Sequence, residues 1–225
     1  MSACLACILA AATSVALSSA LSTLNYAPCK KVGRMRAVFL DVDGVLLPFG
    51  EPGEAEEQEE QACERGKGRF PDRCLKVLSK ILSQTGAVVV LSSTWRCAGG
   101  SAAVIEEFRQ FSLRQNARCP LGVIAEKGDF EYITDPNMHS HRQWEIYAWL
   151  EWAEQEGVKV ESWCALDDEE LVSVDTSEGG GDFNARLQQM FAGRHIKTPS
   201  NVGLTDEHAT RAIAALLRCI SREKN

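Results

Sequence analysis

The sequence predicts an α/β protein built on one central parallel sheet. Short apolar runs alternate along the chain with longer segments of helical periodicity, an order typical of strands joined by crossover helices. The apolar runs are continuous rather than alternating, which indicates strands that are buried on both faces. With 225 residues, 45% of them hydrophobic, the chain is long enough for a single sizeable core.

The first predicted strand covers residues 37–41 and ends in a pair of carboxylates. Asp41 and Asp43 lie two residues apart, and Gly44 follows directly. Side chains two apart on an extended strand point to the same side, so both carboxylates are expected to reach one centre. Gly44 has no Cβ and permits a sharp turn there. Ligands of open α/β sheets bind beyond the carboxyl ends of the strands, where two like charges need a cation or a shared proton. Mg²⁺ fits such an oxygen-only site.

Calcium loops and plain structural turns also use an Asp-x-Asp-Gly sequence. A calcium loop needs further oxygen ligands at alternate positions and a glutamate at the twelfth. Residues 45–49 are all apolar, which excludes a calcium loop here. Taken alone, the pair leaves both catalysis and a structural turn open.

The second predicted strand, residues 87–92, runs directly into a hydroxyl-rich segment, Ser-Ser-Thr-Trp-Arg at 92–96. Hydroxyls and backbone N–H groups at a strand end suit a phosphate oxygen, and Arg96 adds a planar fork of donors. The alternative is that the three hydroxyl residues cap the helix that follows. Trp95 is the tryptophan of the chain that suits stacking on a substrate.

A cation and a second acidic pair follow later in the chain. Arg142 directly precedes the predicted helix 143–156, where a positive charge interacts unfavourably with the helix dipole. Either Arg142 has a functional role there, or it is an ordinary surface residue. The predicted strand 163–167 ends in Asp167 and Asp168. One acidic cluster is usually a solvated turn, but two strands that each end in paired carboxylates favour a shared site.

The remaining elements complete the α/β order. Two further strands are expected at 121–125 and 194–197, and four further helices at 71–84, 101–115, 183–192 and 205–219. Thr205 is expected to be the N-cap of the last helix, with Asp206 and Glu207 favourably placed in its first turn.

This ordered set, over residues 36–218, resembles the haloacid dehalogenase (HAD) superfamily of phosphohydrolases, and most of all the small capless HAD domain of RNA-repair proteins. The resemblance implies a Rossmann-like three-layer sandwich with a minimal cap or none. Asp-Val-Asp-Gly-Val-Leu at 41–46 is similar to the first motif of the family, which implies Asp41 as the nucleophile and Asp43 as the general acid/base. The resemblance also implies Ser92 as the hydroxyl that holds the phosphoryl group.

The same resemblance implies the other members of the site. The implied Mg²⁺ ligands are Asp41, Asp43 (through its backbone carbonyl), Asp167 and Asp168, and the implied substrate-binding residues are Gly44, Ser93, Thr94 and Arg96. The third motif of the family is usually a lysine, and Arg142 is assigned to it here. Lys127 is the alternative, since it follows the apolar run 121–125.

The activity implied is a Mg²⁺-dependent phosphatase that acts through an aspartyl-phosphate on Asp41, and the alternative is a non-catalytic domain that binds a phosphorylated partner. Only residues 47–70 lie between the first motif and the predicted helix 71–84. This segment is too short for a large cap domain, so an open site is expected. Such a site suits a small phosphomonoester, a nucleic-acid end or a phosphoprotein. The net charge of −7 and the pI near 5.2 differ from the excess of positive charge that is typical of a tight nucleic-acid binder.

Residues 1–34 are expected to form a leader outside the phosphohydrolase domain, which covers 35–225. The leader has no charge before Lys30, and it stays open between a targeting peptide, a tail and a misassigned start before Met35. Its many hydroxyls make it a poor bilayer span, so membrane association is not expected. The nine irregularly spaced cysteines favour a reducing compartment inside the cell, or an organelle if the leader is a targeting peptide.

Overall fold

The computed structural model describes residues 34–50, 69–97, 100–115, 119–121, 133–135, 141–172 and 181–218. Four parallel strands form one sheet in the order β2-β1-β3-β4. Their bounds are β1 (Arg34–Leu40), β2 (Val88–Leu91), β3 (Lys159–Asp167) and β4 (His195–Lys197). The parallel sheet predicted from the continuous apolar runs is therefore confirmed.

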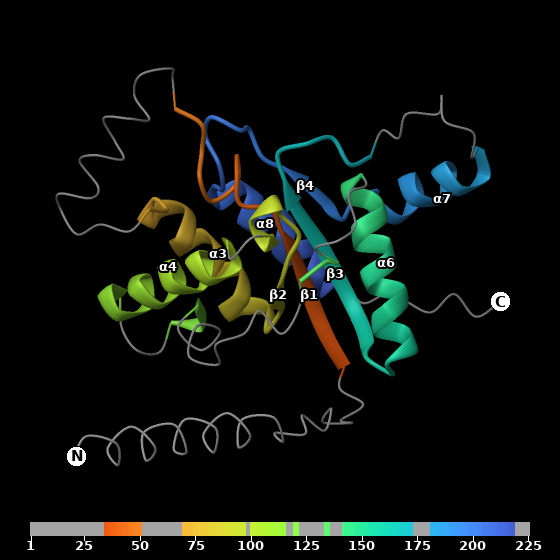
Figure 1. The fold of residues 1–225 in the computed structure, drawn as a ribbon, viewed down its shortest axis with the longest axis horizontal. Coiled ribbons are helices and arrows are strands. Elements are labelled where there is room, and N and C mark those ends of the chain that lie inside the picture. Colours follow the sequence, from red (N-terminus) through yellow and green to blue (C-terminus); the bar gives the residue numbers. More distant parts are fainter. Residues whose placement is uncertain are drawn as a thin grey trace, which may run out of the picture. The chain divides into compact units, whose positions relative to one another are not determined.

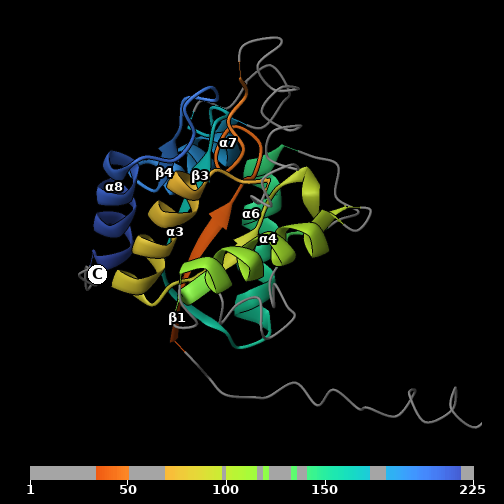
Figure 2. The ribbon, with the colours of Figure 1, turned by 90° about the vertical axis from the view of Figure 1, so that its left-hand side faces the viewer.

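Helices cover both faces of this sheet (Figures 1 and 2). Their bounds are α3 (Asp72–Thr85), α4 (Gly100–Gln115), α6 (Arg142–Gln155), α7 (Gly181–Phe191) and α8 (Asp206–Leu217), and a 3₁₀ turn, η1 (Thr94–Arg96), follows β2. Apolar side chains of α3, α4 and α8 pack on one face, and those of α6 and α7 pack on the other. The Rossmann-like three-layer sandwich is confirmed, and each predicted helix is present to within two residues at either end.

The central strand β1 shows why its sequence is apolar without alternation. Val38 and Leu40 belong to the core beneath α3 and α8. Phe39, on the opposite face, meets Trp149 of α6 and Trp163 of β3 edge to face, with ring centroids 5.3 and 5.6 Å apart. Both faces of β1 are thus dry, as expected for a strand in the middle of a parallel sheet.

The edge of the sheet beside β2 differs from the prediction. Leu121, the first residue of the predicted strand 121–125, lies in a helical turn, and residues 122–125 lie outside the described ranges. Ile133 instead pairs in parallel with Leu91, and the N–H of Thr134 donates to the carbonyl of Leu91 at 3.0 Å. The prediction for Leu121 is wrong because a short apolar run has no period that separates a strand from a buried helical turn.

Strands β1 and β3 also begin earlier than predicted. Arg34 pairs with Lys159, and the Arg34 guanidinium lies 3.2 Å from a carboxylate oxygen of Glu161. These residues are polar and partly exposed at the amino end of the sheet, so the apolar runs alone did not reveal them. The amino end therefore carries surface pairs, and the carboxyl end is left for the site.

Some expectations fall on residues that the structure does not describe. The leader, most of the segment 47–70 and Lys127 lie outside the described ranges, so the separate leader and the minimal cap stay predictions. Thr205 is the N-cap of α8 as predicted, and its N–H donates to Nδ1 of His208 at 3.1 Å. Within the described part of the chain, no helix has the length and apolar character needed to cross a bilayer.

Candidate active site

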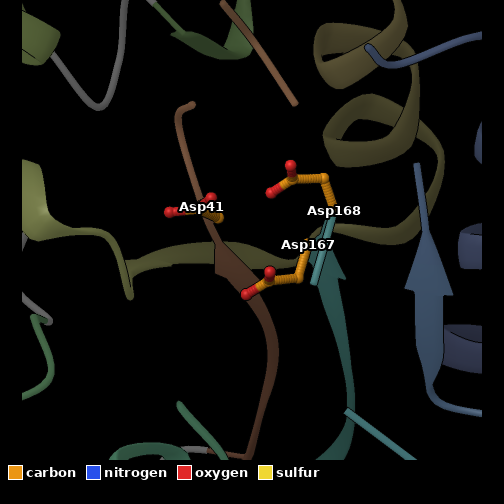
Figure 3. A group of neighbouring side chains, drawn as sticks. All are labelled: Asp41, Asp167 and Asp168. Atoms are coloured by element: carbon orange, nitrogen blue, oxygen red, sulfur yellow. The ribbon is translucent and has the colours of Figure 1, made fainter. Parts of the chain in front are cut away.

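Three carboxylates meet at the carboxyl ends of β1 and β3 (Figure 3). One oxygen from each of Asp41, Asp167 and Asp168 lies within 4.8 Å of the others. The two strands are neighbours, and the N–H of Asp41 donates to the carbonyl of Leu166 at 3.0 Å. Leu40 pairs with Leu166, so the residues that follow them, Asp41 and Asp167, lie side by side although they are 126 positions apart in the sequence.

Arg142 is the first residue of α6 and lies between these carboxylates. Its Nη2 is 3.3 Å from Oδ1 of Asp41, and its Nε is 3.3 Å from Oδ2 of Asp167. Only 10% of its side chain is exposed. The unfavourable position of a cation at a helix start is offset by two acidic partners at short range.

The loop after β2 divides its hydroxyl groups among different tasks. The Ser92 hydroxyl is buried and has no hydrogen-bond partner among the described residues, and its contact with a phosphoryl oxygen stays a prediction. The Ser93 hydroxyl forms a hydrogen bond with the Asp41 carboxyl group. It also accepts from the N–H of Trp95 and is the N-cap of η1, which agrees for this residue with the alternative prediction that the hydroxyls cap the following helix. Thr94 is exposed.

Arg96 is buried against protein acceptors. Its Nη2 lies 2.6 Å from Oε1 of Glu145 on α6, its Nη1 donates to the carbonyl of Ser93 at 2.9 Å, and its Nε donates to the carbonyl of Asp135 at 3.3 Å. These contacts tie the loop after β2 to α6. The expected role of Arg96 in substrate binding stays a prediction, and Glu145 is a partner that the sequence reasoning missed.

Asp43 lies beside Trp95 rather than in the group of three carboxylates. The indole Nε1 donates to Oδ2 of Asp43 at 3.0 Å. The guanidinium carbon of Arg69 lies 4.5 Å from the centroid of the Trp95 ring, and Phe70 meets that ring edge to face at 5.8 Å. These contacts show Trp95 as a support for Asp43, and its suitability for stacking on a substrate stays a prediction.

A family described as the HAD domain in Swiss Army Knife RNA repair proteins matches residues 37–209. The chain belongs to this family. The match covers the last four residues of β1, the loop after β2, α6 and β3, and it confirms the resemblance noted in the sequence. At the level of the family it supports a phosphohydrolase of the HAD type. No curated protein and no solved structure matches the chain.

The three clustered carboxyl groups of this HAD domain have pKa values shifted toward their protonated forms. Burial raises the pKa of Asp41 to about 6, although Arg142 acts against the rise. Burial, followed by the charge of Asp41, raises the pKa of Asp167 to about 8. Burial also raises the pKa of Asp168. Three oxygen ligands that are costly to ionise together fit a small hard cation such as Mg²⁺.

These shifts predict that the metal-free HAD domain loses stability as the pH rises. The pKa values of Asp41 and Asp167 lie above the ordinary value of 3.8, so the folded state binds more protons than the unfolded one. The stabilisation is complete below about pH 4 and is lost as the pH rises through about 6 and 8. Thermal unfolding in chelator at about pH 5 and about pH 8 measures this.

Mg²⁺ supplies the matching arm of that experiment. It is expected to raise the melting temperature more at the higher pH, where the carboxylates bind it without losing protons. The Asp41→Asn, Asp167→Asn double variant is the control, and its pH dependence should be flatter. An equal effect of Mg²⁺ at both pH values would contradict the prediction.

Gly44 forms the turn beside Asp168. Its φ is +68°, and a Cβ built on it would lie 2.4 Å from Cγ of Asp168. The Thr198 hydroxyl donates to the Gly44 carbonyl at 3.0 Å, which ties this turn to the end of β4. Gly44 is therefore required both by its backbone conformation and by the close approach of a site carboxylate.

Replacing Gly44 with Ala is expected to weaken Mg²⁺ binding about tenfold or more, because the new methyl group must displace Asp168. Calorimetric titration of Mg²⁺ measures the change. Gly86→Ala is a matched control, since Gly86 also has a positive φ, +65°, but its Cβ would meet nothing within 4 Å. Equal Mg²⁺ affinity in both variants would show that the methyl group introduced at position 44 does not disturb Asp168.

Proposed function

We propose that this HAD domain is a Mg²⁺-dependent phosphatase that hydrolyses phosphomonoesters through an aspartyl-phosphate on Asp41. The observation that carries the proposal is the placement of Asp41 itself. It is 5% exposed at the end of the central strand and lies 3.3 Å from the Arg142 guanidinium. A carboxylate can attack phosphorus only where its own charge and that of the phosphate are screened, and the site offers that screening.

The metal site fits Mg²⁺ by its chemistry. Asp41, Asp167 and Asp168 would hold the ion, and the Asp43 carbonyl is a fourth ligand implied by the resemblance to the family. All of these donors are oxygen atoms, and the turn at Gly44 leaves no room for a side chain beside Asp168. Bound Mg²⁺ supplies positive charge that neutralises the phosphoryl oxygens.

The protein groups then divide the reaction into two steps. In the first, a carboxylate oxygen of Asp41 forms a bond to phosphorus, the bond to the leaving oxygen breaks, and that oxygen takes a proton from Asp43. In the second, Asp43 removes a proton from water, which attacks the aspartyl-phosphate and releases inorganic phosphate. Arg142 and the Ser92 hydroxyl hold the phosphoryl oxygens in both steps.

A polynucleotide end is the substrate class that the family description favours, since it names RNA repair proteins. The net charge of −7 argues against extended contact with a nucleic-acid backbone. The proposal is therefore confined to a terminal phosphate that enters the site at the carboxyl ends of the strands. The alternative, a non-catalytic domain that binds a phosphorylated partner, is less favoured because Asp41, Asp43, Asp167 and Asp168 are all present.

The decisive experiment is phosphate release by the full chain from an aryl phosphate, with Mg²⁺ and with chelator. Release that needs Mg²⁺ is expected. A screen of 3′- and 5′-phosphorylated oligonucleotides, nucleotides and phosphopeptides then ranks the substrates by kcat/KM. A folded chain that binds Mg²⁺ and releases phosphate from none of them would overturn the proposal in favour of the binding domain.

A further inference from the structure

A buried ion pair joins two segments that carry the site. The Arg96 Nη2 and the Glu145 Oε1 are 2.6 Å apart, and each side chain is only 5% exposed. Arg96 belongs to η1, directly after the loop of Ser92, and Glu145 lies one helical turn beyond Arg142 on α6. The pair therefore connects the predicted phosphate-binding loop with the helix that carries the cation.

The second oxygen of Glu145 faces the other guanidinium. Oε2 of Glu145 lies 3.8 Å from Nη1 of Arg142, and both atoms are buried without a hydrogen-bond partner among the described residues. Glu145 thus lies between two arginines, and Arg142 lies between Glu145 and the carboxylates of Asp41 and Asp167. Arg142 is therefore in contact with Glu145 on one side and with the carboxyl groups of Asp41 and Asp167 on the other.

A buried pair of this kind is poor evidence of stabilisation. Desolvation of two charges can outweigh their attraction, and well-packed apolar residues of similar volume are often as stable or more so. The position of the pair next to the site, between Arg142 and the loop of Ser92, points instead to a role in orienting these groups. An arginine needs such support more than a lysine does, because its donors lie in a rigid planar fork that must be aimed.

We propose that Glu145, held by Arg96, is a positioning residue that fixes the Arg142 guanidinium against Asp41. This inference rests on the proposed phosphatase function. Glu145 is not one of the three carboxylates that would hold the metal, and it acts by setting where the positive charge of Arg142 lies when negative charge builds up on the phosphoryl group. Loss of Glu145 lets the Arg142 fork rotate away from Asp41, so transition-state binding falls more than substrate binding.

The test compares Glu145→Gln with Glu151→Gln, a control at an exposed position of the same helix. Glu145→Gln is expected to lower kcat about 10- to 100-fold on an aryl phosphate with KM changed by less than about threefold. Glu151→Gln should leave both unchanged. Wild-type kcat in Glu145→Gln, with wild-type enzyme active, would overturn the inference and leave the phosphatase standing.

A double variant separates positioning from structure. Arg96→Met with Glu145→Leu replaces the pair by apolar groups, and it is expected to regain the melting temperature lost in either single variant. If Glu145 positions Arg142, kcat stays low in the stable double variant. Wild-type kcat in the double variant would show that the pair only holds the loop after β2 against α6 and does not position Arg142.

An NMR readout keeps the inference testable even if the wild-type chain releases no phosphate, which would be a failure of the proposed function alone. The Nε–H resonance of Arg142, assigned by its loss in Arg142→Lys, reports how firmly the side chain is held. In the metal-free protein it should be sharp in the wild type and in Glu151→Gln, and broadened or shifted in Glu145→Gln. An unchanged resonance in Glu145→Gln would contradict positioning by Glu145.

Discussion

Replacing Asp41 with Asn is expected to lower phosphate release from an aryl phosphate by about 10⁴-fold or more, because the amide cannot form the covalent intermediate. The substitution nearly conserves volume and leaves the backbone bond to Leu166 in place, so the fold should persist. Steady-state release of phosphate in saturating Mg²⁺ measures the effect. Phosphate that accumulates on the wild-type protein after an acid quench, and is absent from Asp41→Asn, would identify the intermediate.

Loss of the nucleophile must be separated from loss of the metal, since Asp41 belongs to the group of three carboxylates. Asp168→Asn is the matched control, because it removes one carboxylate of the same group without removing the attacking atom. Higher Mg²⁺ concentration is expected to restore much of the activity of Asp168→Asn and none of that of Asp41→Asn. Equal recovery in both would contradict the role of Asp41 as nucleophile.

The carboxyl ends of β1 and β3 were predictable because each apolar run ends at an aspartate in the sequence. An apolar run stops at Asp41 in one case and at Asp167 in the other, and parallel strands bring such ends to the same edge of a sheet. The structure confirms that these ends are neighbours. The start of β3 was not predictable in this way, since Lys159 and Glu161 are polar residues on a partly exposed stretch.

The supporting contacts of the site were beyond the sequence for a different reason. Glu145 meets Arg96 across 49 positions, and Asp43 meets Trp95 across 52, so no local period links them. These pairs depend on the packing of η1 against α6 and against the turn that follows β1. One signal was present for Glu145, because a position three residues after Arg142 on a helix lies on the same face.

Replacing Asp43 with Asn is expected to lower turnover of an alkyl phosphate by about 10²–10⁴-fold, the usual contribution of a general acid/base. The loss should be smaller for the first step of a nitrophenyl phosphate, whose leaving group departs without a proton. That substrate should give one rapid equivalent of nitrophenolate and then stop, because the water step still needs a base. Stopped-flow absorbance measures this burst, and equal losses on both substrates would contradict the role of Asp43.

Trp95→Phe tests how Asp43 is aimed. An indole N–H only donates, so Oδ2 of Asp43 is the accepting oxygen, and in the proposed mechanism Oδ1 is the oxygen left to exchange a proton with the leaving group. Without that bond the carboxyl group can rotate, and the first step of the alkyl phosphate is expected to slow about tenfold, more than the burst of nitrophenolate from the nitrophenyl phosphate, because only the alkyl leaving group needs the proton. Trp152→Phe is the control, since Trp152 is 46% exposed on α6. A loss in Trp95→Phe that is equal for the two leaving groups would assign Trp95 to packing with Phe70 rather than to the aim of the acid.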